Sequence, residues 1–335
     1  MRTNRVCDPP ARRAVIGALL GLAATVALAL LPGGALAAFP DRPIRIIVPF
    51  APGGASDLIA RVIAGPLQQE LGQPVIVENH AGANGNIGFG LAAKAEPDGY
   101  TLLVASSVIF VNLPLQRPNS FDPANDFTPI ADLGGSPDAI VTRVESDIKD
   151  FPDLVKRAKA NPRRITFSSS GVGSISQLGI ELLDARAGMK LVHVPYNGAG
   201  PAAQAALSGT TDLAAVNISA AMPLIKGGKL RALVQTGEER WFELPDVPTL
   251  KQAGIADAES ETLQILLAPA KTPQVVADRL SAAVVKVLKS QQIRENLLKT
   301  GFEVSGTGSA ELKKLIATEI AKWRDVITQA NLKVN

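Results

Sequence analysis

The chain has 335 residues, of which 46% are hydrophobic and 19% are charged, and its formal net charge at pH 7 is +3. Residues 1–37 hold four of the 34 basic residues and one of the 31 acidic residues, so the charge of the remainder is near zero. This balance gives no sign of a basic surface, so we expect no nucleic acid and no anionic membrane surface among the partners.

The first 37 residues have the pattern of a secretory signal peptide. Four arginines precede an apolar run over 14–31, and Ala35-Leu36-Ala37 offers a cleavage site after Ala37. A membrane anchor is the alternative, although the apolar run is near the shortest length that spans a bilayer. Arg12-Arg13 leaves the Sec and twin-arginine routes open. Cys7, the only cysteine, would leave with the signal. We therefore expect a periplasmic protein without disulfides.

Strands and helices alternate along the rest of the chain. We predict strands at 44–48, 75–78, 101–105, 165–168, 190–194, 213–216 and 230–235. We predict helices over 57–71, 174–186 and 201–207, and around 276–287 and 312–327. Pro66 removes the helix bond to Val62 and predicts a kink or an early end in the first of them. The alternation indicates an α/β fold with two parallel, doubly wound sheets.

Six loops that follow these strands share a composition rich in Gly, Ser, Asn and Ala. They read PFAPGGASD, HAGANGNIG, SSVIFVN, SSSGVGSISQ, PYNGAGPA and NISAAMP, and their only ionisable side chains are Asp57 and His80. Ligands of open α/β sheets bind at the carboxyl ends of strands. Backbone N–H groups, hydroxyls and helix N-termini there favour negative charge. The loops therefore predict a site for one compact anionic group, such as a carboxylate.

Other kinds of site have weak support. GVGSIS at 171–176 lacks the third glycine of a dinucleotide fingerprint, and the next strand ends in Pro195-Tyr196 without an acidic residue. No Walker lysine motif occurs. The two histidines, His80 and His193, stand apart from any metal-ligand pattern, so we expect no metal and no cofactor. A serine hydrolase would need His193 beside a serine, and no G-x-S-x-G motif is present.

A resemblance to a known family rests on long segments in family order. These are FPDRPIRIIVPFAPGGASDLIAR, GQPVIVEN, GNIG with AKAEPDGYTLLVAS, SSSGVGSISQL, VPYNGAGPAAQAALSGTTDL, LPDVPTL and LLAPAKTP. With them the chain resembles the substrate-binding proteins of tripartite tricarboxylate transporters, the Bug family. The resemblance implies a two-lobed type II periplasmic binding protein that delivers a small organic carboxylate to large and small integral-membrane transporter subunits. In the family the carboxylate lies between loops matching 49–57 and 195–201, partly through bridging waters.

The resemblance also implies a division of the chain and a set of contacts. We expect a signal peptide at 1–37, a first lobe at 38–139 plus 262–335, a second lobe at 140–261, and a monomer. Because Asp57 lies at a helix start, we expect it to cap the helix or complement the helix dipole, in preference to contacting the ligand directly. The expected ligand-binding residues are Phe50, Gly54, Ser56, Asp57, Ser106, Ser107, Ser168, Ser170, Ser174, Gln177, Tyr196, Asn197, Gly198 and Asn217.

Some positions depart from the family pattern. His80 and Asn84 alter the glycine loop after VEN. Gln177 lies in SQLGIE, where the family often has SHLAGE. Gln264 or Ile265 takes the place of a tryptophan that is common in the family. Because the loops have few cationic side chains, we expect a mono- or dicarboxylate, including acidic amino acids and aromatic acids, over citrate. Two alternatives stay open: a receptor that serves a signalling partner, and a periplasmic serine hydrolase.

Overall fold

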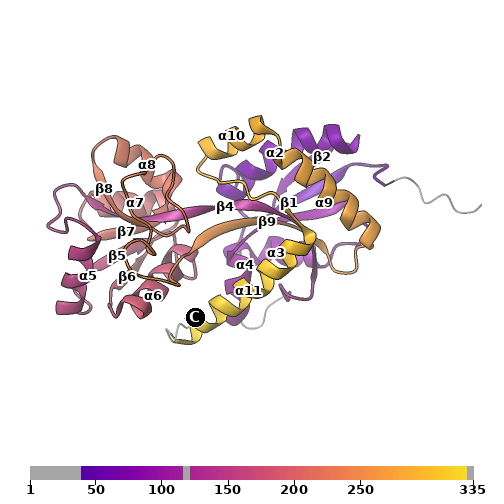
Figure 1. Cartoon of the computed structure of the whole chain (residues 1–335). Coiled ribbons are helices and arrows are strands. Elements are labelled where there is room, and N and C mark those ends of the chain that lie inside the picture. Colours follow the sequence, from indigo (N-terminus) through magenta and orange to yellow (C-terminus); the bar gives the residue numbers. More distant parts are fainter. Residues whose placement is uncertain (1–38, 116–120, 330–335) are drawn as a thin grey trace, which may run out of the picture. The chain divides into compact units, whose positions relative to one another are not determined.

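The computed structural model describes residues 39–115 and 121–329, so the expected signal peptide lies outside the described residues (Figure 1). Contacts divide the chain into residues 1–41 and residues 42–335, and the strands and helices of the described residues lie in the second part. Within the described ranges, no helix is both long enough and apolar enough to cross a membrane. The lobe boundaries given above stay a prediction.

Two sets of parallel strands occupy the ends of one mixed sheet of ten strands (Figure 1). The first set is β2 (Val75–Asn79), β1 (Ile44–Val48) and β3 (Thr101–Ser106), in that spatial order. The second set is β7 (Leu213–Asn217), β5 (Thr166–Ser169) and β6 (Val192–Pro195). Because strands within each set are parallel, their carboxyl ends lie at a common edge.

Two long strands join the sets. β9 (Glu261–Pro269) pairs antiparallel with β3 and with β4 (Phe127–Arg143), which also pairs antiparallel with β7 and β8 (Leu230–Gln235). The expected parallel order is present within each set, but the expectation of two separate parallel sheets is wrong, because antiparallel strands join the sets into one mixed sheet. Breaker residues in the β4 sequence, such as Pro137, argue against a strand. The β4–β9 ladder accommodates two other breakers, Pro129 and Gly134, by register shifts between Pro129 and Ala131 and between Asp132 and Gly134.

Gly134 explains one of these shifts. Its φ is +130°, and a Cβ atom there would collide with the backbone carbonyl oxygen of Glu303. The neighbouring Gly135 exchanges two backbone hydrogen bonds with Glu303, at 3.0 and 2.9 Å. Only a residue without a side chain lets the segment before β10 (Thr307–Gly308) approach β4 this closely.

The helices cover the sheet. They are α2 (Ala55–Leu71), η1 (Ala83–Gly85), α3 (Asn86–Ala93), α4 (Val108–Leu115), α5 (Phe151–Ala160), α6 (Ile175–Ala187), α7 (Ala199–Leu207), α8 (Ile218–Lys226), α9 (Gln274–Leu288), α10 (Gln291–Lys299) and α11 (Ser309–Gln329). The early end expected at Pro66 is wrong, because α2 continues to Leu71. Burial of Leu67 and Leu71 beyond the proline offsets the lost backbone bond.

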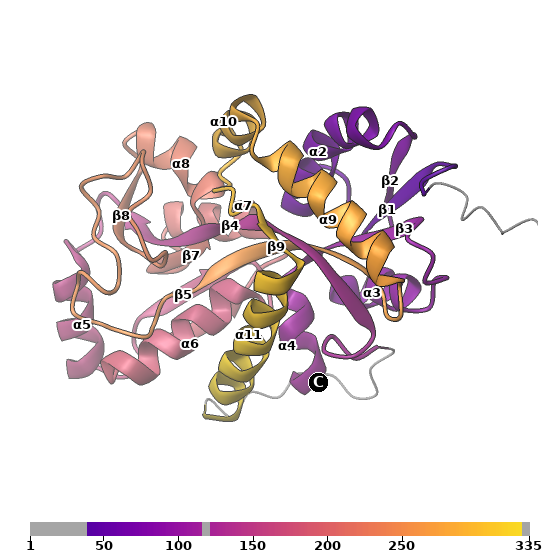
Figure 2. The same cartoon turned by 45° about the vertical axis from the view of Figure 1, so that its right-hand side comes forward.

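The C-terminal helix packs against a helix that follows a strand of each set. α11 contacts β4, α4 and α6, and Figure 2 shows it running alongside α4 and α6. Trp323 on this helix is fully buried, and its Nε1–H donates to Glu319 Oε2 at 2.7 Å. One apolar cluster includes Ile47 of β1, Phe167 of β5 and Trp323. The core is therefore continuous between the two sets.

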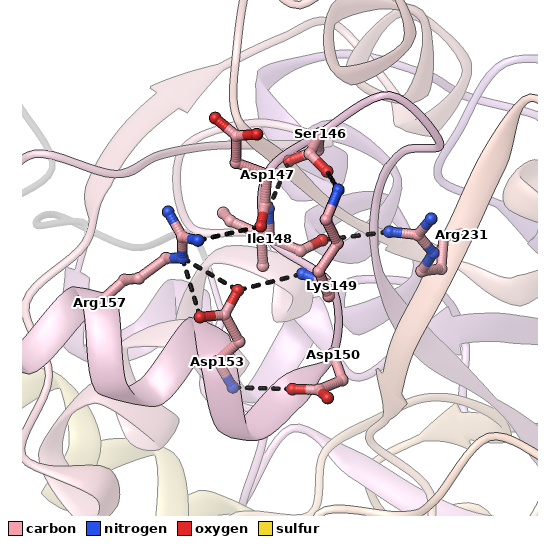
Figure 3. Close-up of polar contacts among 8 residues, drawn as sticks. All are labelled: Ser146, Asp147, Ile148, Lys149, Asp150, Asp153, Arg157 and Arg231. Carbon is pink, nitrogen blue, oxygen red and sulfur yellow. Dashed lines mark hydrogen bonds and ion pairs between the residues drawn. The ribbon is translucent and has the colours of Figure 1, made fainter.

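The start of α5 is held by a polar cluster (Figure 3). Asp150 accepts a hydrogen bond from the Asp153 N–H at 2.8 Å, as an N-cap residue does. Both Asp153 oxygens accept from Arg157 Nε at 2.9 Å, and Arg231 donates to the carbonyl of Ile148 at 3.3 Å. The charges at this surface bind one another, so we assign the cluster a structural role.

Candidate functional site

The loop between β1 and α2 is organised by Asp57. Its carboxylate accepts from the Gly53 N–H at 2.9 Å, from Arg61 Nε at 2.9 and 3.0 Å, and from Asn79 Nδ2 at 2.9 Å. The hydrogen bond from Arg61, with those from Gly53 and Asn79, lowers the pKa of Asp57 to about 2 against the effect of burial. Asn79 also donates to the Phe50 carbonyl at 3.1 Å. Asp57 therefore positions the loop with its own oxygens, and it lies in the first turn of α2, where a negative charge complements the helix dipole.

Three helices that begin at predicted site residues have no side-chain cap among the described residues, as is also true of α3, α9 and α10. The three are α2 after Gly54, α7 after Gly198 and α8 after Asn217. The first N–H groups of a helix have no partner within the helix. Together with the helix dipole, they favour a negatively charged group. All three starting residues were predicted site residues.

The two glycine loops of the second strand set lie side by side. The Tyr196 N–H donates to the Ser169 carbonyl at 3.1 Å, and the Gly198 N–H donates to the Ser170 carbonyl at 3.1 Å. These bonds join residues 169–171, after β5, to residues 196–198, after β6. Asn197 is exposed and Tyr196 is half-buried. The structure thus brings together Ser170, Tyr196, Asn197 and Gly198.

Ser174 and Gln177 belong to the same group through α6. The Ser174 hydroxyl donates to the Gly171 carbonyl at 2.7 Å and accepts from the Gln177 N–H at 3.2 Å, so it caps the helix. Gln177 Oε1 accepts from the Gly173 N–H at 2.8 Å. Ser170 Oγ lies 2.9 Å from Ser176 Oγ. The polar groups of this loop are therefore largely fixed by each other.

The central strand β9 brings the two sets of predicted residues together. Ser56 Oγ, from the start of α2, donates to Gln264 Oε1 at 2.7 Å. Asn217 Nδ2, from the end of β7, lies 3.4 Å from Thr262 Oγ1. Alternate residues of a strand point to the same face, so Thr262 and Gln264 share one. The two predicted halves of the site therefore meet on one face of β9.

Other predicted residues occupy different surroundings. Ser168 is fully buried, and its hydroxyl donates to the Ala202 carbonyl at 2.8 Å, which ties β5 to α7. Ser107 is also fully buried and accepts from the Leu263 N–H at 3.1 Å. Phe50 is half-buried and packs edge-on against Phe89, with ring centroids 6.2 Å apart. The geometry gives these three residues roles in packing and strand pairing.

Sequence reasoning left Thr262 and Asp138 out of the site. Thr262 follows no glycine motif, and Asp138 lies in GGSPDAIV, which contains the signals of a turn. Gln264 had one signal, as a polar residue within an apolar run at a position that departs from the family. The structure distinguishes the two candidates there, because Gln264 bonds Ser56 and Ile265 is a fully buried core residue.

His193 does lie beside a serine, as a hydrolase would require. Its Nε2 is 2.6 Å from Ser169 Oγ, and its ring stacks on Phe167 with centroids 5.0 Å apart. Burial lowers the pKa of His193 to about 4. A triad also needs an acid that orients the histidine, and among the described residues no carboxylate pairs with this ring. Ser169 is fully buried. The pair therefore has the features of a structural contact.

A cavity of about 830 Å³ lies beside α6, is lined also by residues 188–193 and by Val326 of α11, and is lined by none of the expected ligand-binding residues. Glu181, Asp184, Arg163 and Lys190 line it. Burial raises the pKa of both carboxyl groups, that of Asp184 to about 6. Arg163 and Lys190 balance the two carboxylates, so the lining has no excess of positive charge for an anion, and we do not place the expected carboxylate there. Over the described ranges, no group of His, Cys, Asp and Glu side chains could hold a metal ion.

Comparison with known proteins shows what this chain is similar to. A family profile described as "Tripartite tricarboxylate transporter family receptor" matches residues 59–332. The periplasmic binding protein BugD is 29% identical, with a TM-score of 0.75 over 88% of this chain and 99% of BugD. Two Rhodopseudomonas palustris proteins were solved with carboxylates. Rpa4515 with adipate is 30% identical (TM-score 0.78, 88% and 99% covered), and MatC with bound malate is 32% identical (TM-score 0.74, 86% and 100% covered). The predicted fold class is confirmed.

Proposed function

The chain belongs to the family of tripartite tricarboxylate transporter receptors, and on that premise we propose that it is a periplasmic solute receptor and not an enzyme. It captures a small organic carboxylate between its two lobes and delivers it to large and small membrane subunits of a transporter. The observation that carries the proposal is the likeness, over nearly the whole chain, to two proteins solved with adipate and malate.

The residues at the strand ends support the proposal. Uncapped N-termini of α2, α7 and α8 offer N–H groups, and the neighbouring side chains offer hydroxyl and amide groups. Arg61, a cation near the first loop, already binds Asp57. A site that holds an anion on N–H groups suits a carboxylate with one or two charges better than a tricarboxylate.

Calorimetric titration and thermal unfolding test the proposal. The protein, freed of carried ligand by unfolding and refolding, is mixed with adipate, malate, succinate, acidic amino acids, citrate and benzoate. A ligand at 100 times its Kd adds about 2.7 kcal/mol to the free energy of unfolding. We expect at least one carboxylate to do so, while the matching amide does not. A folded protein that responds to none of them would contradict the proposal.

Two further measurements separate the alternatives. Loss of uptake of the identified carboxylate after gene deletion, restored by the gene, is expected for a transport receptor; normal uptake would favour the signalling role. Ester or amide hydrolysis that disappears in His193→Ala would favour the hydrolase. We expect no hydrolysis, because burial keeps Ser169 from solvent and the histidine lacks an orienting acid among the described residues.

A further inference from the structure

Three buried polar atoms on one face of the sheet have no hydrogen-bond partner among the described residues. They are Ser106 Oγ, Ser136 Oγ and Asp138 Oδ2, and the residues are 4%, 1% and 2% exposed. The register places Ser106 opposite Gln264 and Ser136 opposite Thr262. Cross-strand partners share a face, as do alternate residues of β4. The three atoms are therefore on the face of β9 where the two halves of the site meet.

Asp138 is the charged member of this group. Its Oδ1 accepts a hydrogen bond from Asn217 Nδ2 at 2.9 Å, and Asn217 is the residue before α8. Its Oδ2 has no donor in the part of the chain that the structure describes. The charge that acts on Asp138 is the carboxylate of Glu261, which cannot donate a hydrogen bond to it once ionised. A buried carboxylate oxygen without a donor is costly, so the site gains from a ligand that supplies one.

We propose that Asp138 determines the specificity of the receptor by accepting a hydrogen bond from an ammonium or hydroxyl group on the ligand. The preferred ligands are then 2-amino or 2-hydroxy carboxylates. The inference rests on the proposed function. Asn217 connects the place for the ligand carboxylate with the place for the 2-amino or 2-hydroxy group, because it starts the uncapped helix α8 and bonds Asp138 directly. A carboxylate on the N–H groups of α8 would therefore have its 2-substituent close to Asp138.

Matched ligands that differ in one substituent test this inference. Titration calorimetry at pH 8 compares aspartate, malate and succinate, then glutamate, 2-hydroxyglutarate and glutarate. For the wild type, we expect a substituted acid to bind at least about tenfold more tightly than its unsubstituted partner. In Asp138→Asn, which keeps the Oδ1 acceptor for Asn217, this preference should fall below about threefold. A preference for the amino acid over the hydroxy acid identifies the ammonium as the donor.

Asp184→Asn is the matched control. Asp184 also has a buried oxygen without a partner among the described residues and a raised pKa, but it lines the cavity beside α6. Its replacement should leave the preference unchanged. Thermal unfolding shows whether each variant is folded. If unsubstituted acids bind as tightly as substituted ones, or if Asp138→Asn keeps the preference, the inference is wrong and the receptor function stands. If the folded wild type binds none of the acids, the proposed function fails and the inference falls with it.

Discussion

Ser56 and Gln264 lie 208 positions apart in the chain, and Ser56 Oγ donates to Gln264 Oε1 at 2.7 Å. Ser56 is 3% exposed and Gln264 is 1% exposed. The bond attaches the start of α2, next to the first glycine loop, to β9, one of the two strands that join the strand sets. It therefore fixes the first loop relative to the face on which Asn217 also lies.

Replacing Ser56 by alanine tests this attachment. The change leaves Gln264 Oε1 buried without its donor, and loss of such a bond costs about 1–3 kcal/mol. We expect the free energy of unfolding, measured by urea denaturation, to fall by that amount. Ser290→Ala is the control, because Ser290 is exposed and its side chain does not cap α10. An equal loss in both variants would show that the bond is not the cause.

Much of the architecture could be predicted because local sequence agrees with it. The strand at 44–48 and the helical face of Ile59, Ile63 and Leu67 are both present. β4 could not be predicted, because its prolines and glycines indicate turns. The strand exists through long-range pairing with β9 and through the approach of Glu303 to Gly134. Local pattern contains no information on either contact.

The residues of the candidate site also differ in whether local sequence predicts them. Gly54, Gly198 and Asn217 were found because helix starts after strands have a local signature. Asp138 and Thr262 were missed, since each joins the site through a partner distant in sequence. For the same reason Ser168 was included, although its hydroxyl is turned to Ala202. Composition locates the loops, and tertiary packing decides which side chains are available.

Gly134→Ala should be among the most damaging single changes. A Cβ atom there meets the Glu303 backbone, and the φ of +130° is strained for any L residue. We expect a loss of at least about 3 kcal/mol in urea denaturation, or failure to fold. Gly65→Ala is the control, since a Cβ at this exposed position in α2 meets no atom within 4 Å. Pro66 follows Gly65 and disfavours a Cβ on the preceding helical residue, which opposes the usual gain from replacing glycine in a helix, so we expect a change within about 1 kcal/mol. Equal effects would contradict the packing described for Gly134.

Asn197→Ala and Ser170→Ala should weaken carboxylate binding while folding survives. Both residues lie in the paired glycine loops, and the side chain of Asn197 is exposed. Loss of one polar contact with a charged group costs about 1.5–3 kcal/mol, or roughly tenfold or more in Kd. Calorimetry with the best ligand measures the change, and Asn161→Ala, at the exposed end of α5, is the control. Unchanged affinity in both variants would remove the two residues from the site.

Ionisation of Asp138 should make the protein less stable at pH 8 than at pH 4. Burial and the neighbouring Glu261 carboxylate raise the pKa of Asp138 to about 7. Because this value lies above that of the unfolded chain, stability is lost as the pH rises from about 4 through about 7. Asp138→Asn lacks this loss, so its midpoint of thermal unfolding should exceed that of the wild type by roughly 5 °C at pH 8. At pH 4 the two should agree closely; a constant difference would exclude titration of Asp138 as the cause.

Asp57 should have the opposite pH dependence. Its pKa is lowered to about 2, chiefly by the hydrogen bond from Arg61, so its contribution is present above about pH 4 and is lost as the pH falls towards 2. We expect Asp57→Asn to be less stable than the wild type by about 2 kcal/mol at pH 7, and this difference to shrink at pH 2.5. Asp153→Asn removes a similar pair with Arg157, but the Asp153 side chain is 25% exposed against 3% for Asp57. Solvent screens the exposed pair, so its loss should be smaller. If urea denaturation shows the same loss of unfolding free energy in Asp57→Asn and Asp153→Asn, then the burial of Asp57 and its bonds to Gly53 and Asn79 add no stability beyond the ion pair.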